Sequence, residues 1–292
     1  MNIYQYETYQ EKKQHGEIDF PYTTYVCTIP QDFDQVPLHW HEEMEFIYIK
    51  KGQGRVAVNL TEFQVDEGSI ILVLPGQLHS IDTRDPAVRL EYENIIFNSK
   101  KLLLSQDDIC SQKYLIPLFS GKTPVPVHFS PDMEYYQEVA EILNRCDTIR
   151  SRKIYGEEML IKSQLYLLFY VLTTRFRLSE PVLKNRKSLE RMKTVIKHVE
   201  LHYGEQITIE EVAQLVSLST SHFMKCFRET FGCSFVEYLK EYRLTMAARM
   251  LMHSDGNVLE ISELVGFNNL SYFIRSFKVR YGVTPGKYSV KQ

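Results

Sequence analysis

The sequence predicts an α+β chain in which an N-terminal antiparallel β-barrel with a pair of helices precedes a C-terminal all-α domain of two helix-turn-helix motifs. Three observations lead to this fold class. Residues 23–98 contain short β-branched and aromatic segments separated by turn residues. Residues 133–176 change to apolar spacings of three and four. Residues 213–288 repeat themselves after 49 or 50 positions.

The first part of the chain is expected to be a sheet of short strands. The predicted strands are Phe46–Ile49, Arg55–Leu60, Ile70–Leu74 and Val88–Phe97. The turns between them are expected at Gly52–Gly54, Asp66–Gly68, Pro75–Gly76 and Asp85–Pro86. Short strands at this spacing are typical of an antiparallel sandwich or barrel.

Two helices are expected next, at Met133–Cys146 and Gly156–Phe176. The second is apolar on most of its circumference, so it must be covered from two sides. One side is expected to pack on the barrel and the other on a second copy, which predicts a homodimer; packing of both sides within one chain is the alternative. We therefore assign residues 1–178 to one domain, with pairing helices at about 130–178, residues 179–187 to a linker, and residues 188–292 to the second domain.

Charge and cysteine content restrict the partners and the compartment. Residues 181–292 carry 16 Lys and Arg against 11 Asp and Glu, whereas the rest of the chain is acidic. This asymmetry indicates an anionic partner for the C-terminal part alone. The five scattered cysteines contain no C-x-x-C pair, and the longest apolar run, Leu165–Leu172, is too short to span a bilayer. We expect a cytoplasmic protein without a membrane partner.

The internal repeat is the most informative feature of the sequence. Phe223, Phe227 and Gly232 recur 50 residues later as Phe273, Phe277 and Gly282. Helix starts are predicted by Thr208 with Glu211, Ser234 with Glu237, Asn257 with Glu260, and Thr284-Pro285. Gly232 and Gly282 are placed to end helices in a left-handed conformation. Each unit is therefore predicted to be a helix-turn-helix.

The second helix of each unit is expected to present polar and basic residues outward. In a helical projection these are Ser221, Lys225 and Arg228, with Met224 at the flank, and then Ser271, Arg275 and Lys278. Such faces suit the major groove of double-stranded DNA. The helix Phe235–His253 between the units would span about 30 Å, close to one duplex turn of about 34 Å. An ordinary helical bundle with solvated cations is the alternative.

The C-terminal part resembles the AraC/XylS family of transcription regulators. The residues that match its signature are Gly266-Phe267, Tyr272-Phe273, Phe277-Lys278, Gly282, Thr284-Pro285 and Tyr288. The resemblance implies base contacts by Ser221, Met224, Lys225, Leu270, Ser271 and Arg275, and it implies RNA polymerase as a partner. Met224 and Leu270 would contact bases only through apolar surface. Ser217 stands where the family usually has glycine, and Ser262 where it usually has alanine.

A candidate ligand site lies in the N-terminal part. His39, His41 and Glu45 share one face of an extended segment, and His79 follows later. These are ligand types of a divalent metal, and Pro37–Ser80 resembles the two halves of the cupin signature, with Gly68 one residue farther from Pro75 than usual. The resemblance implies a small barrel with an internal site. Trp40, Arg55 and Tyr92 are further candidates for contacts with an effector such as a sugar.

The leading hypothesis is a transcription regulator that binds promoter DNA and is controlled by a small-molecule effector in the barrel. In this hypothesis the protein is not an enzyme and needs no cofactor, although a divalent metal at His39, His41, Glu45 and His79 is a candidate. Two alternatives remain. One is a cupin metalloenzyme, an isomerase or oxygenase, fused to a DNA-binding module. The other is a regulator that senses the metal itself.

Overall fold

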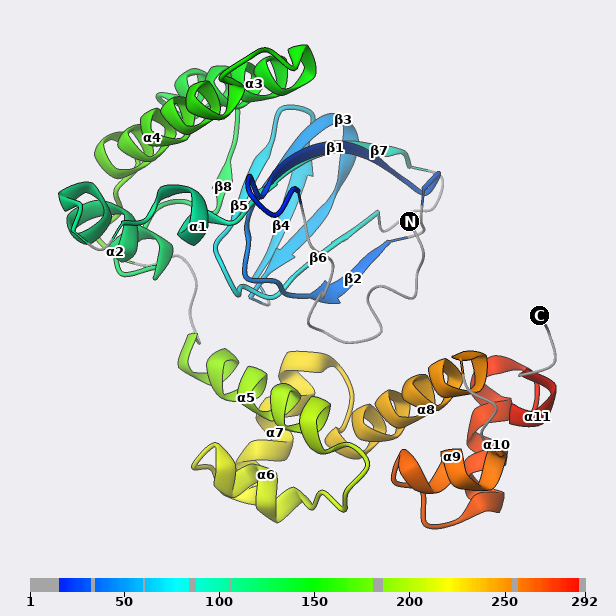
Figure 1. The fold of residues 1–292 in the computed structure, drawn as a ribbon. Helices are drawn as coiled ribbons and strands as arrows, with labels where there is room; N and C mark the ends of the chain where they lie inside the picture. The colour runs from blue at the N-terminus through cyan, green and yellow to red at the C-terminus, as the bar shows by residue number, and fades with distance from the viewer. Residues whose placement is uncertain are drawn as a thin grey trace. The chain divides into compact units, whose positions relative to one another are not determined.

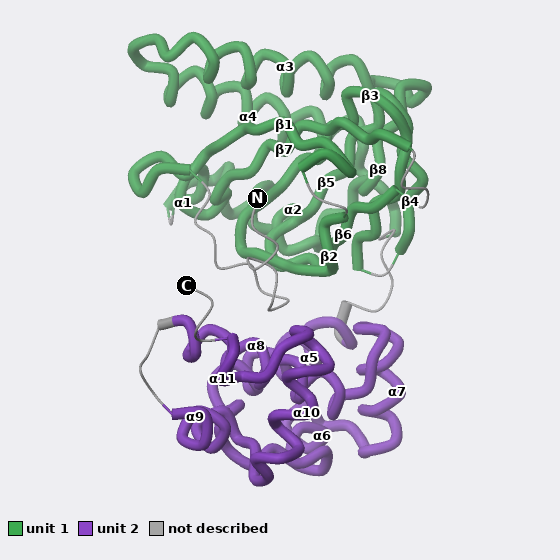
Figure 2. The backbone as a smooth tube through the Cα atoms, turned by 90° about the vertical axis from the view of Figure 1, so that its right-hand side faces the viewer, with its two compact units in different colours: residues 1–184 green, residues 185–292 purple. Residues whose placement is uncertain are grey.

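Two compact units make up the chain, residues 1–184 and residues 185–292 (Figures 1 and 2). The structure is a computed structural model that describes residues 16–32, 35–59, 61–83, 88–105, 107–180, 186–253 and 257–288. The boundary between the units falls inside the predicted linker, 179–187. None of the described helices is long and apolar enough to cross a membrane.

The N-terminal unit is built on an antiparallel sheet. Its strands are β1 (Tyr22–Ile29), β2 (Val36–His39), β3 (Met44–Val58), β4 (Thr61–Asp66), β5 (Ile70–Val73), β6 (His79–Asp82), β7 (Leu90–Phe97) and β8 (His128–Phe129). Five of them follow the order β1-β7-β3-β5-β8, while β2 pairs with β6, and both β4 and β6 pair with β3. The strands wrap around an apolar interior (Figure 1). The predicted fold class is confirmed.

The predicted turn at Gly52–Gly54 is wrong, because β3 continues through these residues as one strand. The first part of β3 pairs with β5 and β7, and the part after Gly52 pairs with β4 and β6. Gly52 has φ +83°, and a Cβ on it would lie 1.9 Å from the carbonyl oxygen of Arg89. Glycine here lets the strand bend close to its neighbour, so one strand serves both halves of the barrel.

Helices cover the outer face of the strands β1, β3 and β7. They are α1 (Ser99–Leu103), a π-helical turn (Ser111–Leu115), α2 (Ile116–Phe119), α3 (Tyr136–Arg152) and α4 (Glu157–Arg175). The buried stripe of α4 packs in one core with Phe46 and Phe97 of the sheet and consists of Ile161, Leu165, Leu168, Phe169 and Leu172. On its other side α4 exposes Met159, Leu160, Leu167 and Tyr170. Packing within one chain therefore leaves part of the apolar surface of α4 uncovered.

The C-terminal unit is all helical. Its helices are α5 (Arg186–His202), α6 (Ile209–Leu215), α7 (Thr220–Phe231), α8 (Phe235–His253), α9 (Val258–Leu264), α10 (Leu270–Tyr281) and α11 (Pro285–Tyr288). The first helix-turn-helix is α6–α7 and the second is α9–α10, with α8 between them (Figure 1). The helix α5 packs on α7, and α8 contacts α7, α9, α10 and α11.

The predicted helix boundaries of this unit are confirmed by the capping geometry. Thr208 with Glu211 and Asn257 with Glu260 form reciprocal capping boxes. The Ser234 amide donates to Glu237, and the Glu237 amide donates to Ser234 Oγ. Gly232 and Gly282 end α7 and α10 with φ +73° each. The capping signals succeed because they depend on residues three or four positions apart.

Candidate DNA interface and buried histidine centre

The second helices of the two motifs have matching cores and matching starts. Ser219 caps α7 by accepting from the His222 amide, and Asn269 caps α10 by accepting from the Tyr272 amide. Phe223 and Phe227 of α7, like Phe273 and Phe277 of α10, are 0 % exposed. One face of each helix is thus fixed against its own core, so the opposite face is the one presented to solvent.

The residues that the helical projection turns outward are all exposed, whereas Leu270, a base contact implied by the resemblance alone, is not. Seven side chains are exposed: Ser221, Met224, Lys225, Arg228, Ser271, Arg275 and Lys278. Leu270 differs, because its half-buried side chain packs against the core of the second motif. Because part of the Leu270 side chain remains accessible, the apolar base contact implied for it stays a prediction.

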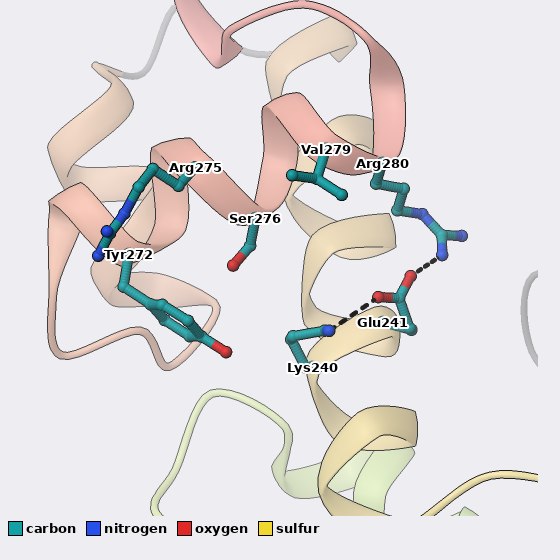
Figure 3. Close-up of a pocket in the computed structure, with 7 residues that line it drawn as sticks. All are labelled: Lys240, Glu241, Tyr272, Arg275, Ser276, Val279 and Arg280. Carbon is teal, nitrogen blue, oxygen red and sulfur yellow. Dashed lines mark hydrogen bonds and ion pairs between the residues drawn. The ribbon is translucent and has the colours of Figure 1, made fainter.

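A groove of about 440 Å³ runs beside α10 (Figure 3). Tyr272 and Arg275 lie on one side of it, and Lys240 and Glu241 of α8 lie on the other. Glu241 pairs with both Lys240 and Arg280. No ion pair or hydrogen bond links Arg275 to any other residue in the described part of the chain. Its guanidinium is therefore available for an anionic or acceptor-bearing partner.

Two exposed side chains in the first turns of these helices were not among the predicted DNA contacts. His222 of α7 and Tyr272 of α10 occupy equivalent places in the repeat, next to the N-caps. The 50-residue spacing that aligned the phenylalanines also aligns these two positions. Both side chains are polar at the tip and belong to the same faces as the predicted DNA contacts.

A second cluster lies inside the barrel of the N-terminal unit. His39, His41 and His79 are buried, and one ring nitrogen of each lies within 4.8 Å of those of the other two. Glu45 Oε2 joins them, 3.1 Å from His41 Nε2 and 2.9 Å from His79 Nε2. Glu45 alternates with Ile47 and Ile49 along β3, both of which face the barrel interior. The structure therefore brings together all four predicted metal ligands.

The other ring nitrogen of each histidine is held by the main chain. The Nδ1 atoms of His39, His41 and His79 lie 2.9–3.1 Å from the carbonyl oxygens of residues 37, 43 and 77. A carbonyl oxygen only accepts, so each Nδ1 carries a proton and a neutral ring has its lone pair on Nε2. In His41 and His79 that lone pair would face the Glu45 carboxylate, which also only accepts. A positive charge, either a proton or a metal ion, is needed there.

The electrostatics of the cluster agree with this arrangement. Burial opposes ionisation of Glu45, but the charges and hydrogen bonds of His79 and His41 outweigh it and hold the pKa of this carboxyl well below its usual range. Burial and the neighbouring rings of His79 and His41 lower the pKa of His39 well below its ordinary value. A carboxylate beside a neutral imidazole is the state in which both bind metals.

Two of the remaining predicted effector contacts, Arg55 and Tyr92, lie away from this centre. Arg55 pairs with Asp82 and Glu62 across the strands, and its neighbour Val56 points into the interior, so Arg55 lies on the outer face of β3. Arg55 does not line the interior as expected, because the pairing of β3 with β7 shifts by one residue between Ile49 and Lys51. This bulge reverses the alternation that would otherwise turn Arg55 to the same side as Glu45. Tyr92 and Trp40 are both buried. Tyr92 pairs with Ile49, four positions and about 13 Å along β3 from Glu45.

Asn94 is an interior polar residue that the sequence analysis missed. It faces the same side of β7 as Tyr92 and Leu90, which belong to the interior core, and it is 7 % exposed. Its Oδ1 is buried and has no hydrogen-bond partner among the described residues. Buried polar atoms are almost always paired in folded proteins, so this oxygen indicates a place where a ligand or a water donates. The signal in the sequence was one amide on the face of β7 that also carries Leu90 and Tyr92.

Comparison with known families gives a match to each of the two units. A model of the AraC-like ligand binding domain matches residues 24–169, and a model of a helix-turn-helix domain matches residues 212–290. The chain belongs to the AraC family of transcription regulators. This AraC-family chain thus carries a ligand-binding domain followed by a DNA-binding domain, as the sequence predicted.

Relatives of this AraC-family regulator extend over nearly the whole chain. It is 29 % identical to the helix-turn-helix-type transcriptional regulator YdeC of Bacillus subtilis over 283 residues, 96 % of this chain and 95 % of the relative. It is 24 % identical to the Msm operon regulatory protein of Streptococcus mutans, covering 82 % of each chain. Neither name supports the metalloenzyme alternative.

Solved structures are also similar to parts of the chain. The DNA-binding domain of AdpA in complex with a target DNA is 26 % identical, with a TM-score of 0.33, and the match covers 34 % of this chain and 90 % of that domain. ToxT of Vibrio cholerae with a bound unsaturated fatty acid is 14 % identical, with a TM-score of 0.41, over 92 % of this chain and 94 % of ToxT.

Proposed function

We propose that this regulator binds its effector in the barrel interior, between the histidine centre and Asn94, and that a divalent cation at the centre is part of the site. The observation that carries the proposal is the convergence of His41 Nε2 and His79 Nε2 on one oxygen of Glu45. Three atoms with lone pairs around one point match the ligand types of Zn, Mn, Fe or Ni. The main-chain carbonyls that hold each Nδ1 fix the ring orientations in the way that metal-binding histidines require.

The oxygen of Asn94 supports an organic component of the effector. It accepts hydrogen bonds, so a ligand rich in hydroxyl groups, such as a sugar, would supply the missing donor. For such a ligand to control transcription, it must favour one state of the regulator over another, because equal affinity for both shifts nothing. A regulator in which the metal itself is the effector is the second candidate, and it is favoured by the charge that the histidine centre requires.

The metal is tested directly on untagged full-length protein that has been treated with a chelator. After addition of ZnSO4, MnCl2 or NiCl2, we expect one metal equivalent per chain from at least one salt. A cation present at 100 times its Kd would stabilise the unit by about 2.7 kcal/mol, which raises its Tm by about 5–10 °C. His41→Ala/His79→Ala should lose both effects. His128→Gln removes a half-buried histidine of β8 outside the cluster and should keep them.

The outcomes separate the candidates. If the metal alone changes the affinity for promoter DNA, then the metal is the effector. If the metal binds without changing DNA affinity, then sugars are screened by Tm shift on the metal-loaded protein, with Asn94→Leu as the variant that should lose the response. Wild-type protein that binds none of the three metals and shows no Tm shift contradicts the proposed cation.

We also propose that the protein acts as a homodimer in the cytoplasm and contacts RNA polymerase at its promoters. The exposed stripe of α4 supports the dimer, because Met159, Leu160, Leu167 and Tyr170 follow one another at helical spacing and are 41–78 % exposed. An apolar stripe on a long helix is the surface that a twofold pair of helices buries. A second copy supplies the same stripe and therefore a matching partner.

The dimer predicts a definite change in mass. Wild-type protein should have twice the 34.4 kDa of one chain in light scattering at micromolar concentration. Leu160→Glu/Leu167→Glu places two charges in the apolar stripe and should give the mass of one chain. Gln137→Glu, which adds a charge on the exposed side of α3, should leave the mass unchanged. A wild-type monomer, or a double variant that stays dimeric, would exclude this interface.

A further inference from the structure

The two helix-turn-helix motifs contact each other through a loop that the sequence analysis did not single out. Tyr203–Glu205 lie in the connection between α5 and α6, directly before the first motif, and α5 packs on α7 of that motif. The Tyr203 side chain nevertheless packs against the core of the second motif, which includes Phe267, Phe273 and Phe277. Its ring also lies 5.4 Å from that of Tyr242 on α8. The helix α8 is thus not the sole connection between the motifs.

The side chain of Arg243 in α8 binds the main chain of this loop. Its Nε donates to the carbonyl oxygen of Tyr203 at 2.8 Å, and its Nη2 donates to the carbonyl oxygen of Glu205 at 2.7 Å. The guanidinium group is planar, so two donors in a fixed fork hold two carbonyls of one loop in one orientation. Hydrogen bonds from a charged donor are about twice as strong as neutral ones.

Two glycines allow the backbones of the two motifs to touch. A Cβ on Gly204 would lie 2.6 Å from the carbonyl oxygen of Leu264, at the end of α9. A Cβ on Gly266, in the turn of the second motif, would lie 2.8 Å from the carbonyl oxygen of Tyr203 and 2.9 Å from the Arg243 guanidinium. Each glycine therefore faces the main chain of the other motif with no room for a side chain.

The repeat shows that the turn itself does not require glycine at 266. Ser217 takes the equivalent place in the first motif, and it adopts φ +54° with its side chain present. A non-glycine residue in this conformation costs about 1–2 kcal/mol, which the first motif tolerates. What distinguishes Gly266 is the close approach of Tyr203 and Arg243. The contact between the motifs therefore explains why residue 266 is glycine, whereas the conformation of its turn alone does not.

We propose that Tyr203–Glu205, Arg243 and Leu264–Gly266 form an intermotif clamp that fixes α7 and α10 relative to each other, so that the protein accepts two half-sites at only one spacing. A helix-turn-helix pair joined by one helix could rotate at the ends of that helix. Contacts at the clamp remove this freedom before DNA binds, which lowers the entropy lost on binding. A rigid pair also rejects half-sites that are out of phase, because one base pair changes both the distance and the angle between them.

The test uses the full-length protein and a duplex selected by it from a random pool. Affinities are measured for this duplex and for the same duplex with one base pair inserted between the half-sites. Wild-type protein should bind the lengthened duplex at least about tenfold more weakly than the selected one, equivalent to about 1.4 kcal/mol. This ratio of the two affinities is the quantity compared between variants. Arg243→Gln removes the fork but keeps most of the side chain, and the ratio should fall below about threefold. Gly204→Ala, which pushes the loop from Leu264, should lower the ratio in the same way.

Controls separate the clamp from general damage. Ser217→Gly alters the equivalent turn outside the clamp and should keep the wild-type ratio. A duplex with a single half-site should bind Arg243→Gln as well as it binds wild-type protein, because each motif is intact. Should Gly204→Ala fail to fold, Arg243→Gln decides. The proposal is overturned if wild-type protein binds both spacings equally, or if Arg243→Gln keeps the wild-type ratio.

Discussion

Phe227→Ala is expected to lower the free energy of unfolding of the C-terminal unit by about 3–5 kcal/mol. Phe227 is 0 % exposed, and its ring lies 4.6–5.7 Å from the rings of Phe223, Phe231, Phe235 and Tyr238. Removing the ring leaves a cavity among four aromatic side chains that cannot all move inward. Since domains are stable by only about 5–15 kcal/mol, this is a large share of the total.

Calorimetry of the full-length protein measures this effect. The transition of the C-terminal unit should move down by at least about 10 °C, because 1 kcal/mol corresponds to about 4–8 °C for a unit of this size. Met224→Ala, on the exposed face of the same helix, should change the stability by no more than about 0.5 kcal/mol. Equal shifts for the two variants would mean that the burial pattern of α7 is wrong.

Arg275→Ala is expected to reduce discrimination at one half-site by about 1–3 kcal/mol, which is roughly 5-fold to 150-fold. Arg275 is exposed on α10, lines the groove in Figure 3, and has no ion pair with another described residue. Its donors are therefore not engaged before DNA arrives, and an arginine in a major groove recognises guanine with two hydrogen bonds.

Competition binding with every base pair of the selected duplex substituted in turn gives the readout. Arg275→Ala should lose preference at one or two adjacent base pairs while the other half-site keeps its full pattern. Arg191→Ala, an exposed arginine on α5, should retain the wild-type pattern whatever it does to overall affinity. A variant of Arg275 whose relative affinities match those of wild-type protein would remove this residue from the interface.

Features that depend on neighbouring residues were predictable from the sequence. The capping pairs, the C-terminal glycines and the buried phenylalanine faces are set by spacings of one helical turn. The set of His39, His41 and Glu45 was predicted from one extended segment, but the structure interrupts that segment between His39, the end of β2, and Met44, the start of β3. The repeat identified both motifs. The resemblance to the cupin signature could assign His79 as a ligand candidate. Its distance of 2.9 Å from Glu45 could be known only from the fold.

Features that depend on distant segments were not predictable. A Gly-Gln-Gly sequence is compatible with a turn or with a bent strand, and the proximity of Arg89 decides for the strand. The outward direction of Arg55 depends on the register shift of β3 between Ile49 and Lys51. The clamp joins residues 203–205 to 243 and 264–266, so no local pattern predicts it. The same holds for the unpaired oxygen of Asn94, whose surroundings come from other strands.

We expect α7 and α10 each to enter a major groove of the same duplex. The most direct measurement compares the base preferences of Lys225→Ala and Arg275→Ala on the selected duplex. We predict that the two variants lose discrimination at different positions, separated by about 10–10.5 base pairs. Loss at the same positions in both variants, or unchanged preferences in both, would show that α7 and α10 do not recognise separate major grooves.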